Sequence, residues 1–208
     1  MNLYEMKLDE YLNAASSKSP TPGGGSVSAV VAANAAAMVS MVANLTLGKK
    51  AYEAVQENIK SILAEIEKLM TETKILTDKD MLAFQKFMDA WKLPAATDEE
   101  KAIKANALEE AAKNATLVPL ELCGVCLDIL RQASILAPIG NKTAISDVGV
   151  AVYLAEAALN AAMLSVDINL PSVTDEAFKQ DVKQKKAQLL TEAAEIKLLA
   201  LAEVKKRL

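Results

Sequence analysis

Histidine is absent from this 208-residue sequence. The missing side chain is the usual general base near neutral pH, a common zinc ligand and the base of Ser-His-Asp triads. Its absence excludes triad hydrolases of that type. It also excludes the His/Cys/Cys zinc site of nucleobase deaminases, because the two cysteines present cannot complete such a site. Any proton transfer must therefore rely on Asp, Glu, Lys, Tyr or a thiol.

Aromatic residues, glycine and proline are also scarce. Aromatics make up 4% of the chain, and there are seven glycines and six prolines. Strands are enriched in aromatic and β-branched residues, whereas the alanine and leucine that dominate here favour helices. We therefore predict an all-α protein, and the length suits one domain covering residues 1–208.

The sequence lacks a basic block. Its net charge is −4, and few aromatics are available to stack on bases, so we expect no nucleic-acid partner. The two cysteines, Cys123 and Cys126, lie in an apolar stretch with no second pair of ligands, which favours small core residues over a redox or metal site. The N-terminus lacks the basic start and early apolar segment of a secretory signal, and we expect a cytoplasmic protein.

The chain does contain a long run without charge, PTPGGGSVSAVVAANAAAMVSMVANLT, at residues 20–46. A helix of this length would span a bilayer. However, alanine dominates the run, and polar side chains such as Ser28 and Asn44 interrupt it, so the free energy that drives membrane insertion is small. A helix apolar on all sides otherwise suits a bundle centre or an oligomer interface. Residues 146–168 form a second, nearly uncharged helix of small residues. We predict a multihelical bundle with two buried, small-residue helices that forms a homodimer and has no membrane partner.

Apolar residues at helical spacing and local start and stop signals predict the individual helices. Ser26 offers an N-cap hydroxyl, and Gly48 provides a stop. Thr77 and Thr97 each begin a Thr-x-x-acid start signal, and Pro119 predicts a kink or a new start. The expected helices cover residues 2–18, 27–47, 51–76, 77–93, 97–117, 120–136, 146–168 and 174–208.

The first candidate site is the run Gly23, Gly24, Gly25 and Ser26 at the start of the first uncharged helix. Glycines permit a positive φ and let a ligand approach the main chain, and a helix N-terminus favours anions or polar ring edges. The alternative is a plain turn between helices. Three consecutive glycines favour the binding role, since two would suffice for a turn.

The second candidate site lies at the start of the other, nearly uncharged helix, where Asn141 precedes Asp147. Asp147 opens so apolar a helix that we expect its carboxylate to face the protein interior, where a raised pKa would suit a general base. The alternative is that Ser146 or Asp147 simply caps the helix.

The third candidate site is Asp80, which follows Asp78 at a predicted helix start. Paired carboxylates there can be no more than partners of the helix dipole. In a chain without histidine, however, they are among the few acid/base candidates. Lys49, Lys50 and Lys142 could hold substrate carboxylates, although a single lysine is more often only a solvated charge.

Several motifs occur together in a recognisable order. They are Pro20-Thr21-Pro22-Gly23-Gly24-Gly25-Ser26, Met41-Val42-Ala43-Asn44-Leu45-Thr46-x-Gly48-Lys49-Lys50, Asp80-x-x-Ala83-Phe84, Gly140-Asn141, Ser146-Asp147 and Ile168-Asn169-Leu170. With these motifs the chain resembles the formiminotransferase-cyclodeaminase C-terminal domain family, which also includes bacterial methenyltetrahydrofolate cyclohydrolases.

The resemblance implies a dimeric, all-helical enzyme acting on one carbon held between N5 and N10 of tetrahydrofolate. A cyclohydrolase adds water to 5,10-methenyltetrahydrofolate and yields 10-formyltetrahydrofolate. A cyclodeaminase closes 5-formiminotetrahydrofolate and releases ammonia. The methenyl group is already a cation, so the resemblance implies a folate substrate with no tightly bound cofactor and no metal.

On this basis we hypothesise a role for each candidate. Asp80 or Asp147 handles protons at the one-carbon unit; Gly23, Gly24, Gly25 and Ser26 shape the pocket; Asn44 and Asn141 offer amide hydrogen bonds; and Lys49 or Lys50 meets the glutamate tail. We favour the cyclohydrolase because no formiminotransferase domain accompanies the chain. The alternatives are a cyclodeaminase and a non-catalytic, folate-binding helical dimer.

Overall fold

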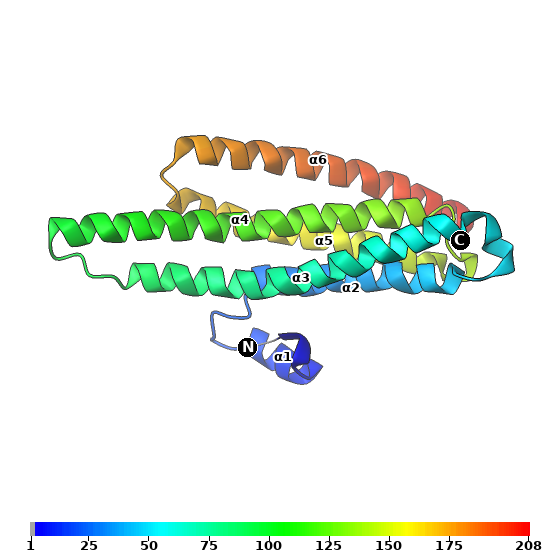
Figure 1. The fold of residues 1–208 in the computed structure, drawn as a ribbon, viewed down its shortest axis with the longest axis horizontal. Coiled ribbons are helices and arrows are strands. Elements are labelled where there is room, and N and C mark those ends of the chain that lie inside the picture. Colours follow the sequence, from blue (N-terminus) through cyan, green and yellow to red (C-terminus); the bar gives the residue numbers. More distant parts are fainter. Residues whose placement is uncertain (1–2) are drawn as a thin grey trace.

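Five long helices lie side by side along one axis in the computed structural model, which describes residues 3–208 (Figure 1). Successive helices run in opposite directions. The described residues contain no strand, which confirms the predicted all-α class. The five helices are α2 (Gly24–Thr46), α3 (Gln56–Trp91), α4 (Asp98–Leu136), α5 (Ile145–Asn169) and α6 (Glu176–Arg207).

The N-terminal segment lies beside the bundle (Figure 1), and the Tyr4 hydroxyl lies 3.4 Å from Oγ1 of Thr77 on α3. The helix predicted at 2–18 is shorter than expected: its one α-helix is α1 (Leu8–Ala15), after a 3-10 turn at Leu3–Glu5, and residues 1 and 2 lie outside the described part. Three more 3-10 turns connect the long helices, at Lys50–Val55, Lys142–Ala144 and Leu170–Ser172.

The core lies among α2, α3, α4 and α5, and α6 packs against α4 and α5. α2 and α5 are long and apolar enough to cross a membrane, yet half of each is buried inside the fold. Their buried faces consist mainly of alanine, for example Ala32, Ala36, Ala151 and Ala155. Because alanine projects so little from a helix, neighbouring backbones can approach closely. This confirms the two predicted small-residue helices, although each keeps one face outside the core.

The helix start predicted at Thr77 is wrong, because α3 continues without a break from Gln56 to Trp91. The Thr77 hydroxyl donates to the Thr73 carbonyl one turn back, at 2.8 Å, instead of capping a new helix. A Thr-x-x-Asp sequence fits a helix interior equally well when its hydroxyl bonds backward. Asp80 therefore lies in the middle of a long helix.

Pro119 does not divide α4, which runs from Asp98 to Leu136. Proline has no N–H to give to the carbonyl four residues earlier, which belongs to Ala115. The side-chain amide of Asn169 donates to that carbonyl instead, at 2.7 Å. A contact from the end of α5 thus replaces the hydrogen bond that α4 lacks.

The start of α2 also differs from the prediction. Gly23 is the N-cap residue, so the helix begins at Gly24 and not after Ser26. The buried Ser26 hydroxyl exchanges hydrogen bonds with the main chain of Gly23, with both distances at 3.1 Å. At the other end, Gly48 has φ of 71° just past the helix, as its predicted role as a stop requires.

Candidate active site

A cavity of about 360 Å³ opens at the N-terminus of α2. Four helices and the segment before α2 contribute to its wall. The lining residues are Pro20, Thr21, Gly23, Gly24, Gly25, Asp80, Ala83, Phe84, Phe87, Met88, Ala115, Ser165, Ile168 and Asn169. Three of the sequence motifs, namely the glycine run, Asp80-x-x-Ala83-Phe84 and Ile168-Asn169, therefore meet at one place.

Asp80 projects from α3 toward the first turn of α2. Burial raises the pKa of its carboxyl group, and a hydrogen bond from the Ser26 main-chain N–H opposes this shift. A carboxylate with a raised pKa is a better base than an exposed one. Among the cavity residues Asp80 is the one carboxylate, so the structure supports it as the acid/base group of this cavity.

Gly25 explains how the carboxylate can lie so close to α2. A Cβ atom at this position would lie 2.1 Å from Oδ1 of Asp80 and 2.6 Å from its Cγ. Any side chain at position 25 would therefore displace the carboxylate. The sequence predicted that a ligand would lie close to the main chain of the glycine run. In the structure, the Asp80 side chain lies close to the main chain of Gly25.

The predicted use of glycine for a positive φ is wrong in the run from Gly23 to Gly25, because Gly48 is the one described residue with a positive φ. Gly23 has φ of −105°, and α2 begins with Gly24. The side chain of Ser26 is occupied by Gly23, so Ser26 contributes its main-chain N–H to the site.

The opposite wall is held by Asn169. Its Nδ2 donates to the Ala115 carbonyl that Pro119 leaves free, and Ala115 itself lines the cavity. Phe84 and Asn169 belong to motifs recognised in the sequence but had no predicted role, whereas Phe87 and Ser165 were not predicted at all. A signal was present for the two phenylalanines, since positions four and seven after Asp80 share its helix face.

The other predicted site residues lie at the opposite end of the bundle. Asp147 is in the first turn of α5, 22 residues or about 33 Å along the helix from Asn169. Asn44 lies 19 residues, about 28 Å, beyond Gly25 along α2. Lys49 and Lys50 line a separate, shallow cavity of about 290 Å³. Within one chain, these residues do not meet Asp80.

Asn141 has a clear structural role at that far end. Its side-chain amide donates to the Leu45 carbonyl at 2.8 Å, and its main-chain N–H donates to Oγ1 of Thr46 at 2.8 Å. Its Oδ1 accepts from the main chain of Thr143 at 3.1 Å. Asn141 thus connects the end of α2 to the start of α5. We call Asn44, Lys49, Lys50, Asn141 and Asp147, which lie at this end of the bundle, the far-end candidates.

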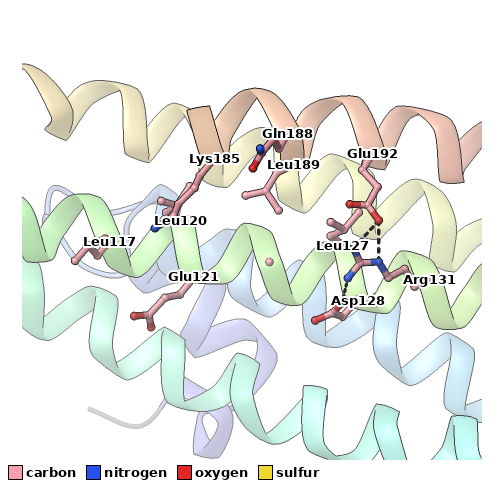
Figure 2. A pocket seen from close by; sticks show the side chains of 11 residues that line it. Leu117, Leu120, Glu121, Leu127, Asp128, Arg131, Lys185, Gln188, Leu189 and Glu192 are labelled. Atoms are coloured by element: carbon pink, nitrogen blue, oxygen red, sulfur yellow. Dashed lines mark hydrogen bonds and ion pairs between the residues drawn. The ribbon is translucent and has the colours of Figure 1, made fainter. Parts of the chain in front are cut away.

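A larger groove of about 510 Å³ between α4 and α6 contains none of the predicted site residues (Figure 2). Leucines form much of its wall, and its charges are already paired. Arg131 contacts Asp128 at 2.6 Å and Glu192 at 2.5 Å. Lys185 pairs with Asp181 at 2.8 Å. The smaller cavity at Asp80 is therefore the candidate active site.

The two cysteines lie in the core, as predicted. Cys123 and Cys126 are buried and free. Burial raises the pKa of the Cys123 thiol to about 12 and that of Cys126 well above its usual value. Neither thiol can be an effective nucleophile or proton carrier at neutral pH.

Comparison with known proteins supports the family resemblance that the sequence motifs indicated. The sequence matches the formiminotransferase-cyclodeaminase family over residues 7–188. It is 44% identical over 187 residues to the methenyltetrahydrofolate cyclohydrolase of Methylorubrum extorquens, covering 89% of each chain.

Longer relatives and a solved structure are also similar. The chain is 34% identical over 200 residues to the formimidoyltransferase-cyclodeaminase of Gallus gallus, covering 96% of this chain and 37% of that protein. The crystal structure of formiminotetrahydrofolate cyclodeaminase from Thermotoga maritima superposes with a TM-score of 0.89 at 30% identity, covering 98% of both chains.

Proposed function

The chain belongs to the formiminotransferase-cyclodeaminase family, and we propose that it is a methenyltetrahydrofolate cyclohydrolase acting in one-carbon metabolism. The observation that supports this most strongly is the position of Asp80, a carboxylate held in a cavity by burial and by a helix N-terminus. The 44% identical relative has that name, and it is matched over nearly all of its length.

In the proposed reaction, Asp80 first acts as a base. The oxygen of a water molecule attacks the methenyl carbon between N5 and N10 while Asp80 takes one of its protons. The C–N5 bond then breaks, its electron pair goes to N5, and Asp80 returns the proton there. The remaining hydroxyl becomes the formyl oxygen as its proton leaves to solvent, so methenyl cation and water give 10-formyltetrahydrofolate and one proton.

The electrostatics of the cavity suit this sequence. The substrate carbon is positively charged before attack and neutral afterwards, so the nearby Asp80 carboxylate favours binding of the cation. The Ser26 N–H and the first turn of α2 stabilise the ionised carboxylate and limit the rise of its pKa. Burial and the helix N-terminus together keep Asp80 ionised enough to attract the cation and basic enough to accept a proton.

We propose that the active unit is a homodimer formed through α2 and α5. The outward positions of α5 make an apolar stripe at helical spacing: Val150, Tyr153, Ala157, Ala161, Leu164 and Ile168. α2 carries a matching uncharged face beside it, through Val30, Asn34, Met38 and Met41. Exposed apolar surface of this length favours association, and a second copy of the same surface is the partner that two-fold symmetry provides.

Such a dimer also gives the far-end candidates a role. If the two-fold axis crosses α2 at right angles, the start of one α2 lies beside the end of the partner copy. Asp147, Asn44 and the lysines of one chain would then approach the Asp80 cavity of the other. Lys49 and Lys50 could add positive charge near the substrate, and Asn44 could offer its amide.

A paired folate assay tests the chemistry. The purified chain is incubated with 5,10-methenyltetrahydrofolate, with loss of methenyl absorbance and formation of 10-formyl product followed, and separately with 5-formiminotetrahydrofolate, with ammonia measured. We expect hydrolysis of the methenyl compound, and Asp80→Asn should lower its kcat by at least about 100-fold. Asp78→Asn is the matched control, since Asp78 is exposed two residues away. Normal turnover by folded Asp80→Asn would refute the assignment.

Mixed dimers test the shared site. If Asp147 completes the partner's cavity, then Asp80→Asn and Asp147→Asn subunits should each be inactive alone. Mixing them in equal amounts should restore about a quarter of the wild-type rate, because half of the dimers then have one intact site of two. Recovery of no activity, with both parents inactive, would refute a site shared between the two subunits.

The cyclodeaminase is the second candidate, supported by the close superposition on the Thermotoga maritima structure. Ammonia release exceeding 10-formyl production in the paired assay would favour it. Tight binding of methenyltetrahydrofolate without turnover would instead indicate a folate-binding dimer that lacks activity. We further propose that the protein is cytoplasmic, because its two free thiols suit a reducing compartment.

A further inference from the structure

The α3–α4 hairpin extends well past the start of α2 (Figure 1). Beyond Asp80, the face of α3 that lines the cavity continues through Phe84, Phe87 and Met88 to Trp91, at steps of three and four residues. Phe84 is 36% exposed and Trp91 is 60% exposed. A line of aromatic side chains thus leads from the cavity along the hairpin toward solvent.

The line ends at a lysine from α4. Lys104 lies 11 residues before Ala115, just as Trp91 lies 11 residues after Asp80, so the two antiparallel helices place both at the hairpin's outer end. Nζ of Lys104 lies 5.7 Å from the centre of the Trp91 ring and donates to the Leu93 carbonyl at 2.9 Å. The aromatic line therefore ends at Trp91, with the ammonium group of Lys104 beside its ring.

Most lysines at this end of the bundle are paired with a carboxylate, whereas Lys86 and Lys104 are in no ion pair among residues 3–208. Lys92 pairs with Asp89, Lys101 with Asp98, and Lys113 with Asp175. No carboxylate among residues 3–208 lies within ion-pair distance of Lys104. Its ammonium group can donate three hydrogen bonds, and the Leu93 carbonyl accepts one of them. The charge of Lys104 is thus available for a carboxylate from outside the chain.

Resting on the proposed function, we propose that Phe84, Trp91 and Lys104 form the subsite for the aminobenzoyl-glutamate arm of the folate. With the one-carbon unit at Asp80, the benzoyl ring lies about one helical turn away, beside Phe84. Trp91 is about 16 Å from Asp80 along α3. Measured from the one-carbon unit, the carboxylates of the first glutamate lie about 10 Å away, and each further γ-linked glutamate adds about 6 Å. The carboxylates of a second glutamate therefore lie at the distance of Trp91 and Lys104.

The neighbouring cavity of about 720 Å³ between α3, α4 and α6 offers no equal site for the arm. Of its two lysines, Lys113 already contacts Asp175 at 2.9 Å and Glu109 at 3.6 Å, and Lys86 shares the cavity wall with the carboxylates of Asp89 and Glu110. These contacts raise the pKa of Lys113, chiefly through the hydrogen bond to Asp175. An arriving carboxylate would have to displace two existing carboxylates at Lys113 and would face two more in the cavity wall, whereas at Lys104 it displaces none.

Kinetics with two substrates test the subsite. For the wild type and for Lys104→Gln, kcat and KM are measured with 5,10-methenyltetrahydrofolate bearing one or three glutamates. We expect Lys104→Gln to raise KM about tenfold for the triglutamate, to change it less for the monoglutamate, and to leave kcat unchanged, because the contact serves substrate and transition state equally. Lys104→Arg should keep the low KM, and Lys86→Gln, an exposed lysine on another face of α3, should resemble the wild type.

A second measurement does not require turnover. Trp91 is the chain's single tryptophan, so intrinsic tryptophan emission reports on this position alone. Titration with 4-aminobenzoyl-triglutamate, which lacks the pterin, should quench the emission of the wild type and require about tenfold more ligand in Lys104→Gln.

The two measurements separate the possible failures. A wild type that hydrolyses neither folate overturns the proposed function, yet quenching by the fragment would still support the subsite. Turnover with unchanged KM values in Lys104→Gln, together with no quenching, overturns the subsite and leaves the proposed function intact. Loss of the low triglutamate KM in Lys49→Gln but not in Lys104→Gln would assign the tail to the far-end lysines instead.

Discussion

Replacing Gly25 by alanine tests how closely the Asp80 carboxylate must approach α2. The added Cβ atom would lie 2.1 Å from Oδ1, whereas ordinary contact begins at 3.4 Å, so the carboxylate must retreat by 3.4 − 2.1 = 1.3 Å. A misplacement of about 1 Å at a reacting group costs about 100-fold in rate. We expect kcat to fall by about that factor, equivalent to about 2.7 kcal/mol of transition-state stabilisation.

The assay follows methenyl absorbance for the wild type, Gly25→Ala, Asp80→Asn and the double variant, with helical content checked by circular dichroism. If Gly25→Ala acts only by moving the carboxylate, adding it to Asp80→Asn should cause little further loss. Gly124→Ala is the matched control, because a Cβ there meets nothing within 4 Å. It should keep full turnover and gain up to about 1 kcal/mol of stability.

Two outcomes contradict this reasoning. A folded Gly25→Ala protein with wild-type kcat would mean that the position of the carboxylate does not limit the reaction. A 100-fold loss on top of Asp80→Asn would mean that the new methyl group acts on the substrate directly and not through Asp80.

Three further predictions follow from the same contacts. Because burial raises the folded-state pKa of Asp80 above its unfolded value near 3.8, the protonated form is favoured in the fold, and stability is lost as pH rises from the unfolded to the folded pKa. Asp80→Asn should therefore be more stable than the wild type by about 1 kcal/mol at pH 7 in urea denaturation, with the difference vanishing below the unfolded pKa; an equal gain at both extremes of pH would contradict this. Asn169→Leu should lower the unfolding free energy by about 1–3 kcal/mol by leaving the Ala115 carbonyl unpaired, and adding Pro119→Ala should recover part of it by restoring an N–H; a double variant no more stable than the single one would argue against this exchange. Leu164→Glu should dissociate the proposed dimer in sedimentation experiments, whereas Leu198→Glu on α6, equally exposed, should not; identical sedimentation of both variants would place the interface elsewhere.

The sequence indicated the helical class and the two uncharged helices well, because these depend on local composition. Alanine-rich runs with no charge at 20–46 and few charges at 146–168 do not suit surface helices, so burial followed from the pattern alone. The stop at Gly48 was also predictable, since a positive φ favours glycine. The capping box at Thr97 is another local signal, and the structure confirms it with a 3.1 Å hydrogen bond from Glu100.

Errors arose where a distant contact overrides a local signal. Pro119 looks like an interruption until Asn169, 50 residues later, supplies the missing donor. Thr77 looks like a cap until its hydroxyl bonds back to Thr73. In both cases the local sequence pattern does not show which hydrogen bond forms.

The candidate site was predictable only in part. Asp80, Phe84, Asn169 and the glycine run belong to motifs identified in the sequence, but Ala115 and Ser165 join them only through packing of four helices. The motifs alone also could not show that Asp147 and Lys49 lie at the other end of the bundle. Helix length determines that separation, and the helix boundaries predicted at Thr77 and Pro119 do not occur in the structure.

The unbroken course of α3 has a consequence for how the chain can vary in length. Inserting one residue near its start would rotate every later side chain by about 100°. Asp80 would turn away from Gly25, and Trp91 from Lys104, although the helix itself would remain intact. Insertions and deletions can therefore be accommodated in the connections at 47–55 and 92–97, whereas within α3 one extra residue would separate the acid from its substrate as surely as a substitution.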